Sequence, residues 1–387
     1  MFSKSLKSLL AAVFSVFLLL SSTVLLANDQ PTGEKAKKID PAKIILEHVA
    51  DAHDFHFFTI NGEPWSIPLP VILYSSGKGV AVFMSSAFHH GNEAHAGYRL
   101  LNEHFSEEHK LNEIKDAKGQ AVYAEGKIYV VDANGMPELN TRVFDFSFTK
   151  NALQVFLSLI LLVWMMVGVA NAYKKGQGVK TAPSGFQNAV EPVITFVRDE
   201  VGKPNLGKHY EKYMPYLLTV FFFILINSLL GLIPGTANVS GNIAFTAMLG
   251  LIAFVVIMLN TKTHFWGHIA NPPVPLGIKP IMIPVEILGI FTKPFALIIR
   301  LFANMISGHI IILSFICLIF VFGTMNTALG WGTSPFFVLL SVFIYLIEIL
   351  VAFIQAFIFA NLTAVFIGQA FEGSHGETEG HDDAVII

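Results

Sequence analysis

The sequence contains very little cysteine and few charged residues. Among its 387 residues there is one cysteine, and Asp, Glu, Lys and Arg together make up 14%, where soluble domains carry about 25%. The single cysteine, Cys317, lies in an apolar stretch, so disulfide bonds are not part of the design. The net charge of -3 offers no excess of positive charge for a nucleic-acid partner. These absences disfavour a disulfide-rich secreted domain and a nucleic-acid-binding protein.

The chain is instead rich in apolar residues. Hydrophobic residues make up 53% of it, and 35 phenylalanines stand against four tryptophans. This composition is typical of helices that face lipid. We predict an all-α polytopic membrane protein with five transmembrane helices, two of them long, tilted and paired as an antiparallel hairpin. A small β-rich exported domain precedes them.

One apolar stretch, residues 281–320, carries ionisable side chains within it. It is longer than the ~20 residues that a helix needs to cross a bilayer, and it contains Glu286, Lys293, Arg300 and His309. An arginine at membrane depth costs at least ~2.5–3.5 kcal/mol on insertion scales and cannot lose its proton. Long apolar runs follow Arg300, so its side chain has no short route to the interface. We predict a functional role for Arg300, against the alternative of an arginine paired within a helix bundle.

The first 27 residues have the pattern of a secretory signal peptide. Two lysines precede an uncharged run from Leu9 to Ala27. Leu25 is large for its place before a cleavage site, so an uncleaved anchor is the alternative. Either way, the residues that follow are expected outside the cytoplasm.

Residues 28–145 form the most polar part of the chain and are predicted to be a β-rich periplasmic extension. Turns are expected at residues 75–79 and 134–135, and a helix near Tyr98–His109. The predicted strands are Phe55–Ile60, Val71–Tyr74, Val80–Met84 and Lys127–Val131.

Histidines are concentrated in this extension. Two close pairs, His53 with His56 and His104 with His109, raise the possibility of a metal site. Neither pair has the HExxH spacing, and no cysteine accompanies them. We therefore predict solvated histidines, no metal and no cofactor. Of the 14 histidines, those in the extension are His48, His53, His56, His89, His90, His95, His104 and His109.

A membrane domain is predicted over residues 146–371. Lysines follow the first apolar stretch directly, which marks that end of the helix as cytoplasmic. The last two stretches exceed a perpendicular crossing, so those helices must tilt. The predicted spans are 146–172, 215–234, 243–260, 281–322 and 336–371.

The segments between and after these spans also have recognisable patterns. Residues 184–201 are predicted to form an amphipathic helix on the cytoplasmic surface, with Ser184 and Gln187 as a capping box. Asn271–Pro275 is expected to break any helix, and Gly323–Pro335 to form the loop of the hairpin. Residues 372–387 are predicted to be an acidic, disordered cytoplasmic tail.

The polar residues of the two long helices fall into one register. In an antiparallel hairpin about that loop, the register that sets His309 level with Glu348 also sets Arg300 level with Gln355. A histidine beside a carboxylate can exchange protons at neutral pH. The alternative is a static ion pair within the membrane.

Arg300 shares its helix face with two small polar residues. Asn304 and Ser307 follow it at the i+4 and i+7 positions, whereas His309 lies nine residues on and faces the other way. A permanent cation repels protons and holds a neighbouring carboxylate in its ionised form. The arrangement suits two separate aqueous regions with a cation between them.

Three segments of the sequence resemble subunit a of F-type ATP synthases, over roughly residues 146–368. In that family an essential arginine, a neighbouring asparagine and a last-helix glutamine fall on Arg300, Asn304 and Gln355. The family also places one Glu and one His at two further positions, in either order, and here they are His309 and Glu348. The segments are Leu301-Phe302-Ala303-Asn304-Met305 with Ser307-Gly308, Ile354-Gln355-Ala356-Phe357-Ile358-Phe359, and Asn227 to Pro234.

The resemblance implies the static half of a rotary motor in a bacterial inner membrane, not an enzyme on its own. It implies a ring of c subunits, the b subunits of the peripheral stalk and, indirectly, the F1 sector as partners. Two half-channels would carry protons to and from the ring, with Arg300 separating them. The common form of the family is shorter, so the resemblance says nothing of the exported domain. On this view Glu286 and Lys293 are structural groups near the interface. Two rival hypotheses remain. An ion-coupled secondary transporter predicts inverted repeats, none of which is evident, and a receptor or sensor with the exported domain as ligand binder leaves the membrane charges unexplained.

Overall fold

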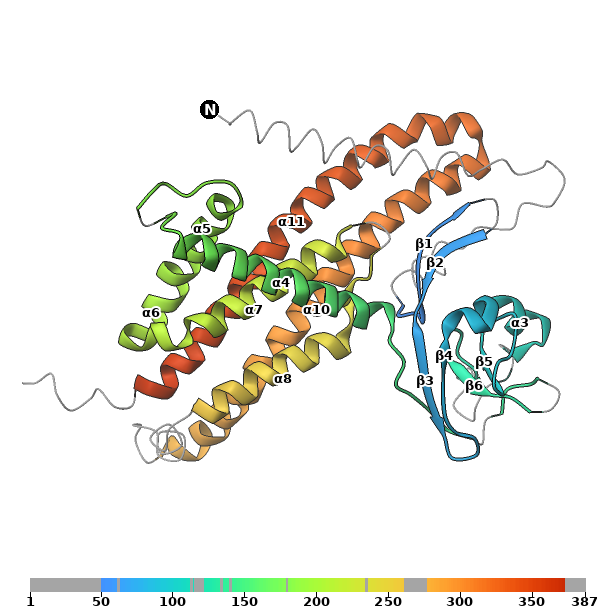
Figure 1. Cartoon of the computed structure of the whole chain (residues 1–387), viewed down its shortest axis with the longest axis horizontal. Coiled ribbons are helices and arrows are strands. Elements are labelled where there is room, and N and C mark those ends of the chain that lie inside the picture. Colours follow the sequence, from blue (N-terminus) through green and yellow to red (C-terminus); the bar gives the residue numbers. More distant parts are fainter. Residues whose placement is uncertain are drawn as a thin grey trace, which may run out of the picture.

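The computed structural model consists of a bundle of long helices and a small β-rich part at one end of it (Figure 1). It describes residues 50–60, 63–111, 114, 122–132, 135–138, 141–178, 180–233, 236–260 and 277–372. The predicted signal peptide, the helix-breaking segment Asn271–Pro275 and the tail from residue 373 lie outside the described residues.

The β-rich part contains three small antiparallel sheets. Strand β1 (Asp54–Ile60) pairs with β2 (Glu63–Pro68), and β5 (Tyr98–Leu100) pairs with β6 (Ile128–Val130). The third sheet has the order β4-β3-β7, from β3 (Pro70–Ser75), β4 (Gly79–Met84) and β7 (Val143–Asp145). A 3-10 helix, η1 (Ser85–Gly91), and helix α3 (Glu103–Glu108) complete this part. Its core is built from Val71, Leu73, Phe88, Tyr98, Ile128 and Val130.

All four predicted strands are confirmed, as is the hairpin turn that pairs Ser75 with Gly79. Strands β2, β5 and β7 were not predicted: β2 contains two prolines, and the other two have three residues each. The predicted helix over Tyr98–His109 is shorter than expected, because Tyr98–Leu100 pairs with β6 and the helix starts only after its N-cap, Asn102.

Each of the five predicted spans coincides with a helix. In chain order these are α4 (Lys150–Lys174), α7 (Tyr210–Gly231), α8 (Ile243–Asn260), α10 (Lys279–Met325) and α11 (Thr327–Glu372). Within the described residues, four helical segments are long and apolar enough to cross a membrane: Lys150–Lys174, Phe186–Gly231, Lys279–Met325 and Thr327–Gly368. Helix α8 is a shorter apolar helix that lies beside α10.

The helix predicted over residues 184–201 is present as α5 (Phe186–Phe196), which continues into a π-helical turn, η3 (Val197–Gly202). Two short helices, α6 (Lys203–Leu206) and η4 (Gly207–His209), then lead into α7. The predicted capping box is wrong. Gly185, with φ of 63°, is the N-cap, and the side-chain nitrogen of Gln187 donates instead to the backbone oxygen of Gln177 at 3.1 Å.

The predicted loop over Gly323–Pro335 is also wrong. Helix α10 ends at Met325, and Asn326 alone has an extended backbone before α11 begins at Thr327. The Asn326 side chain accepts a hydrogen bond from the backbone N–H of Ala328 at 2.9 Å, which starts the new helix at once. A Cβ added at Gly330 would lie 2.7 Å from the Cα of Gly323, so these glycines allow close contact of the helices rather than ending them.

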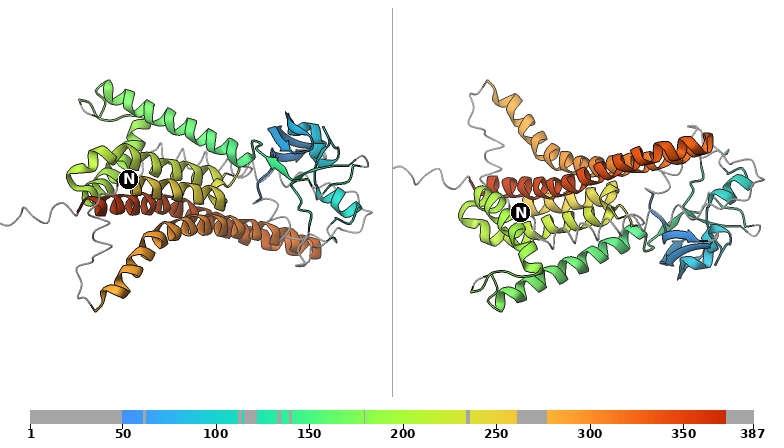
Figure 2. Two further views of the ribbon diagram at one scale, coloured as in Figure 1. Left: turned by 90° about the horizontal axis from the view of Figure 1, so that it is seen from below. Right: turned by 90° about the horizontal axis from the view of Figure 1, so that it is seen from above.

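The two long helices form the predicted antiparallel hairpin (Figure 2). Helix α7 packs in the middle of the bundle against α4 and α11, and small residues on α11 such as Ala356, Ala360 and Ala364 are fully buried there. Buried amides tie the elements together. Gln154 of α4 exchanges two hydrogen bonds with the backbone of Ala237, and Asn238 donates to the backbone oxygen of Met305 on α10.

The β-rich part is attached to α4 by a compact joint. His53 and Asp145 lie at the two ends of this part, and Nε2 of His53 is 2.6 Å from Oδ2 of Asp145. The backbone N–H of Lys150 donates to the backbone oxygen of Ala52 at 2.9 Å, and that of Asn151 to the carboxylate of Asp51 at 3.3 Å. Two free N–H groups at the start of α4 are thereby satisfied by the β-rich part.

We predict that this joint loosens in acid. Burial disfavours the Asp145 carboxylate, but hydrogen bonds from His53 and Ser147 outweigh that effect and hold the pKa of Asp145 below its ordinary value of 3.8. The stabilisation is therefore fully present above pH 3.8 and is lost as the pH falls through the lower folded value. Asp145→Ala should accelerate hydrogen exchange at the Lys150 and Asn151 amides at neutral pH, measured by mass spectrometry. Glu107→Ala on the exposed face of α3 is the control, and equal exchange in both variants would contradict the prediction.

Candidate functional site

Arg300 lies near the middle of α10. This helix has 47 residues, so it is about 70 Å long and more than twice as long as the ~30 Å hydrocarbon core is thick. A helix of this length that crosses the bilayer must be strongly tilted from the membrane normal. The side chain of Arg300 is exposed, and within the described part of the chain it makes no hydrogen bond or ion pair. A permanent cation in this position would be stabilised by a partner from outside the chain.

The face of α10 that carries Arg300 is lined by small residues. Ala296, Ala303 and Ser307 are exposed on the same side, at helical spacing from the arginine. The Ser307 hydroxyl donates to the backbone oxygen of Asn304 at 3.1 Å, and Asn304 itself is half-buried. Small residues let a neighbouring helix approach closely, so this face is open to a partner helix that would meet the guanidinium.

Glu348 points into the contact between α11 and α10. Its side chain is buried, and a methyl group added at Gly308 would overlap its carboxylate. Neither carboxylate oxygen has a hydrogen-bond partner among the described residues. A buried carboxyl group without partners is costly, so packing alone does not account for this residue. The Glu348 carboxylate fits beside α10 because Gly308 has no side chain.

The predicted register of the hairpin agrees with this contact. Glu348 lies against Gly308, the residue before His309, and His309 is half-buried. Gln355 is buried two turns further along α11, on the same side as Glu348. The structure gives no hydrogen bond between Arg300 and Gln355. Arg300 faces outward, and Glu348 lies inside the hairpin.

Sequence reasoning missed Ser341. It is buried two turns before Glu348, and its hydroxyl has no partner among the described residues. Ser341, Glu348 and Gln355 repeat every seven residues along one face of an otherwise apolar helix. This seven-residue spacing is the signal in the sequence that could have identified Ser341. Together the three residues form a polar stripe along α11.

The histidines of the β-rich part make contacts with different partners. His90 lies 3.3 Å from the carboxylate of Asp54, and His104 lies 3.8 Å from that of Glu108. The ring of His109 stacks on Phe105 at 4.1 Å. Among the residues that the structure describes, no three His, Cys, Asp or Glu side chains gather as metal ligands would.

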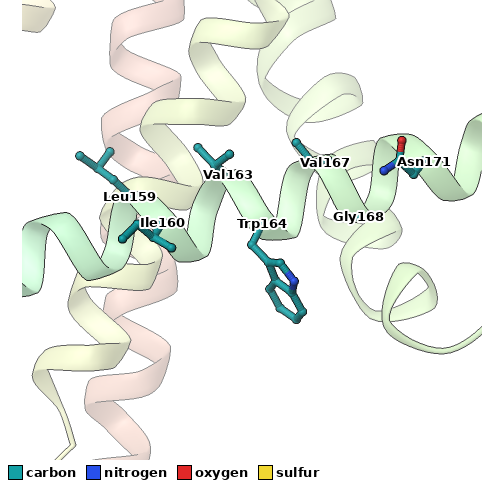
Figure 3. A pocket seen from close by; sticks show the side chains of 7 residues that line it. All are labelled: Leu159, Ile160, Val163, Trp164, Val167, Gly168 and Asn171. Carbon is teal, nitrogen blue, oxygen red and sulfur yellow. The ribbon is translucent and has the colours of Figure 1, made fainter.

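A shallow hollow of about 600 Å³ runs along the outer side of α4 (Figure 3). Its lining is apolar apart from Asn171, and the Trp164 ring lies near Phe186 of α5, with ring centres 5.9 Å apart. With no ionisable lining residue, it has the character of a lipid-facing surface rather than of a catalytic site. The lining residues are Leu159, Ile160, Val163, Trp164, Val167, Gly168 and Asn171.

Comparison with known families gives one match for each part of the chain. Residues 152–368 match the family model described as ATP synthase A chain. Residues 44–146 match a model described as a domain of unknown function. The first match contains every residue of the candidate site, and the second coincides with the β-rich part.

Curated relatives agree with the first match. A protein of Chloroherpeton thalassium named ATP synthase subunit a is 44% identical over 253 residues, which is 64% of this chain and 74% of the relative. One of Myxococcus xanthus with the same name is 40% identical over 255 residues, 64% of this chain and 80% of the relative.

A third relative, the subunit a of Chlorobium phaeobacteroides (strain BS1), is 37% identical over 328 residues, 80% of this chain and 94% of the relative. An alignment of that extent is longer than residues 146–387, so it reaches into the β-rich part. At least part of that region is therefore shared with a relative.

Proposed function

The chain belongs to the ATP synthase A chain family, whose subunit a forms the proton channel of the Fo sector, and from this premise we propose which of its residues move protons. Arg300 separates two half-channels and meets each acidic side chain of a ring of c subunits as it passes. His309 and Glu348 relay protons to that ring, and Asn304, Ser307 and Gln355 line the route.

The guanidinium of Arg300, exposed and unpaired among the described residues, is the observation that carries the proposal. A cation at mid-helix that faces lipid is unstable, whereas one that faces an acidic side chain of a partner is stabilised. The small residues Ala296, Ala303 and Ser307 give a partner helix room to come close. By holding the passing carboxylate ionised, Arg300 forces each proton to leave before that carboxylate reaches it.

The buried carboxyl group of Glu348 supports the relay. Its oxygens have no partner among the described residues, so they are available to water or to a proton donor within the hairpin. His309 is next to Gly308, the residue that Glu348 contacts. Imidazole and carboxylate together exchange protons near neutral pH. Proton is accordingly the coupling ion that these groups fit.

The orientation of the chain in the membrane follows from the placement of charges. Lys174 and Lys175 end α4 on the side opposite the β-rich part, and an excess of lysine marks a cytoplasmic surface. The β-rich part is then periplasmic, and protons enter near Glu348 from that side of the inner membrane. The c-ring and the b subunits are the direct partners, and the F1 sector is coupled through them. The rival hypothesis of a secondary transporter has no support in the family match.

Exchanging His309 and Glu348 tests the relay. The double variant His309→Glu with Glu348→His should retain more ATP-driven proton pumping in membrane vesicles than either His309→Ala or Glu348→Ala, because it keeps both groups at one level of the hairpin. Glu286→Gln, which alters a carboxylate outside the proposed relay, is the control and should pump normally. Pumping as low in the exchange variant as in the double alanine variant would refute the pairing.

A further inference from the structure

The sheet formed by β3, β4 and β7 has an apolar outer face. Its inner face is covered: Val71 and Leu73 are fully buried against Phe88 and Tyr98. Its outer face is not covered by the described residues. Tyr74 pairs with both Val80 and Phe144 across the sheet, so these three side chains share one side. The outer face consists of Tyr74 (44% exposed), Val80 (69%), Val82 (66%), Met84 (46%), Phe144 (52%) and Phe146 (67%).

A face of this kind needs something to cover it. Alternation along each strand places every second residue outward, and in a sheet exposed to water those positions are polar. Here every outward position of β4 and β7 is apolar, and so is Phe146 just beyond β7. Contiguous exposed apolar surface marks an interaction site for a protein or a membrane.

The outer face continues without a break into the membrane helix. Beyond β7, the backbone N–H groups of Phe146 and Phe148 donate to the oxygens of Ile72 at 2.9 Å and Pro70 at 3.1 Å. These two hydrogen bonds hold the chain beside β3 beyond the end of β7, as far as Phe148. The ring of Phe148 then contacts Phe156 of α4, with ring centres 5.7 Å apart. Phe156 is itself exposed on α4.

The position of the sheet relative to α4 is restrained. Helix α4 starts five residues after Asp145, so the end of β7 lies within about 18 Å of its first turn. The joint around His53, Asp145 and Asp51 fixes this connection. In Figure 1, α3, β5 and β6 lie farther from the helices than β3 does, so the sheet lies on the side of this part that is nearer to the helices.

We propose that the outer face of this sheet rests on the lipid bilayer, in the leaflet at the N-terminal end of α4. The β-rich part is then a peripheral membrane domain rather than a freely solvated one. Tyr74 and the phenylalanines occupy the interfacial layer, where aromatic rings are enriched. Arg142 is exposed just before β7, where it can meet anionic headgroups.

Continuity is the reason to choose lipid over a protein partner. The stripe from Phe144 to Phe156 joins the sheet to the lipid-facing side of α4, which also carries Trp164 (Figure 3). A protein that covered the sheet would have to end at the membrane surface or insert beside α4. A bilayer covers both surfaces at once.

Site-specific fluorescence in vesicles tests the proposal. The full-length chain with Cys317→Ser has no other cysteine, so a nitrobenzoxadiazole probe can be placed at Val82→Cys on the outer face or at Glu108→Cys on α3. The vesicles contain phosphatidylethanolamine and phosphatidylglycerol, with or without a nitroxide-labelled lipid. We expect several-fold stronger nitroxide quenching at position 82 than at position 108. Equal quenching at the two positions would overturn the proposal.

A charged substitution provides a second measurement. Val80→Asp, beside the probe on the same face, should reduce quenching at position 82 several-fold, whereas Lys127→Asp, exposed elsewhere in the β-rich part, should not. Comparison with the assembled synthase distinguishes a protein partner. If the probe at position 82 is exposed to water in vesicles of the isolated subunit and becomes shielded only in the assembled complex, the occupant is a protein and the lipid proposal is wrong.

Discussion

Arg300→Ala is expected to abolish ATP-driven proton pumping while the subunit still inserts and assembles. The guanidinium is exposed and makes no hydrogen bond or ion pair within the described part of the chain, so its removal breaks no contact that the structure shows. In the proposed mechanism, what is lost is the barrier between the two half-channels and the charge that ionises each passing carboxylate. Pumping in inverted vesicles should fall to background. Arg300→Lys should recover little, because an ammonium group lacks the planar fork that binds a carboxylate at two points.

Lys279→Ala is the matched control for this prediction. It removes a cation from the same helix, but at its N-terminal end rather than in its middle. We expect it to pump nearly as well as the unmodified chain. Amounts of subunit and of co-purified c-ring should be equal in all variants. Normal pumping by Arg300→Ala, or loss of the c-ring from that variant alone, would contradict the role proposed for Arg300.

Gly308→Ala is expected to remove most of the proton pumping through a single methyl group. The added carbon would overlap the Glu348 carboxylate, so the side chain or the helix must move. Overpacking of this kind costs about 1–3 kcal/mol. Alanine forms helices better than glycine by about 1 kcal/mol, so weaker helix formation cannot cause the loss. Displacement of Glu348 from the level of His309 is the expected cause.

Gly289→Ala provides the matched control on the same helix, because a Cβ added there meets nothing within 4 Å. It should leave pumping unchanged. In the Gly308→Ala background, Glu348→Asp shortens the side chain by one methylene group and should restore part of the activity. If Gly308→Ala and Gly289→Ala pump equally well, the close contact between Gly308 and Glu348 has no part in transport.

Several features of the fold were predictable because they depend on local chemistry. The apolar stretches identified each long helix, and the cost of burying a cation singled out Arg300. The approximate register of the hairpin was also predictable, because residues at equal depth in antiparallel helices have numbers with a nearly constant sum. The contact of Glu348 with Gly308 agrees with it.

Other features depended on contacts that are remote in sequence. Gly323–Pro335 has the composition of a loop, yet it is helical except at Asn326, because glycines there bring two helices together instead of ending them. Ser184 and Gln187 fit a capping box, but the buried Gln187 is drawn to the backbone of Gln177. Strand β7, with three residues, exists only because β3 pairs with it.

The sequence by itself determined that this chain forms long apolar helices with a cation near the middle of one of them, since hydropathy and charge act residue by residue. Only the tertiary structure decided which way those residues face. Whether Arg300 points outward, whether Glu348 is buried, and which side of the β3 sheet stays uncovered all depend on how helices and strands pack together. Packing joins residues that are far apart in the chain, and local patterns do not encode it.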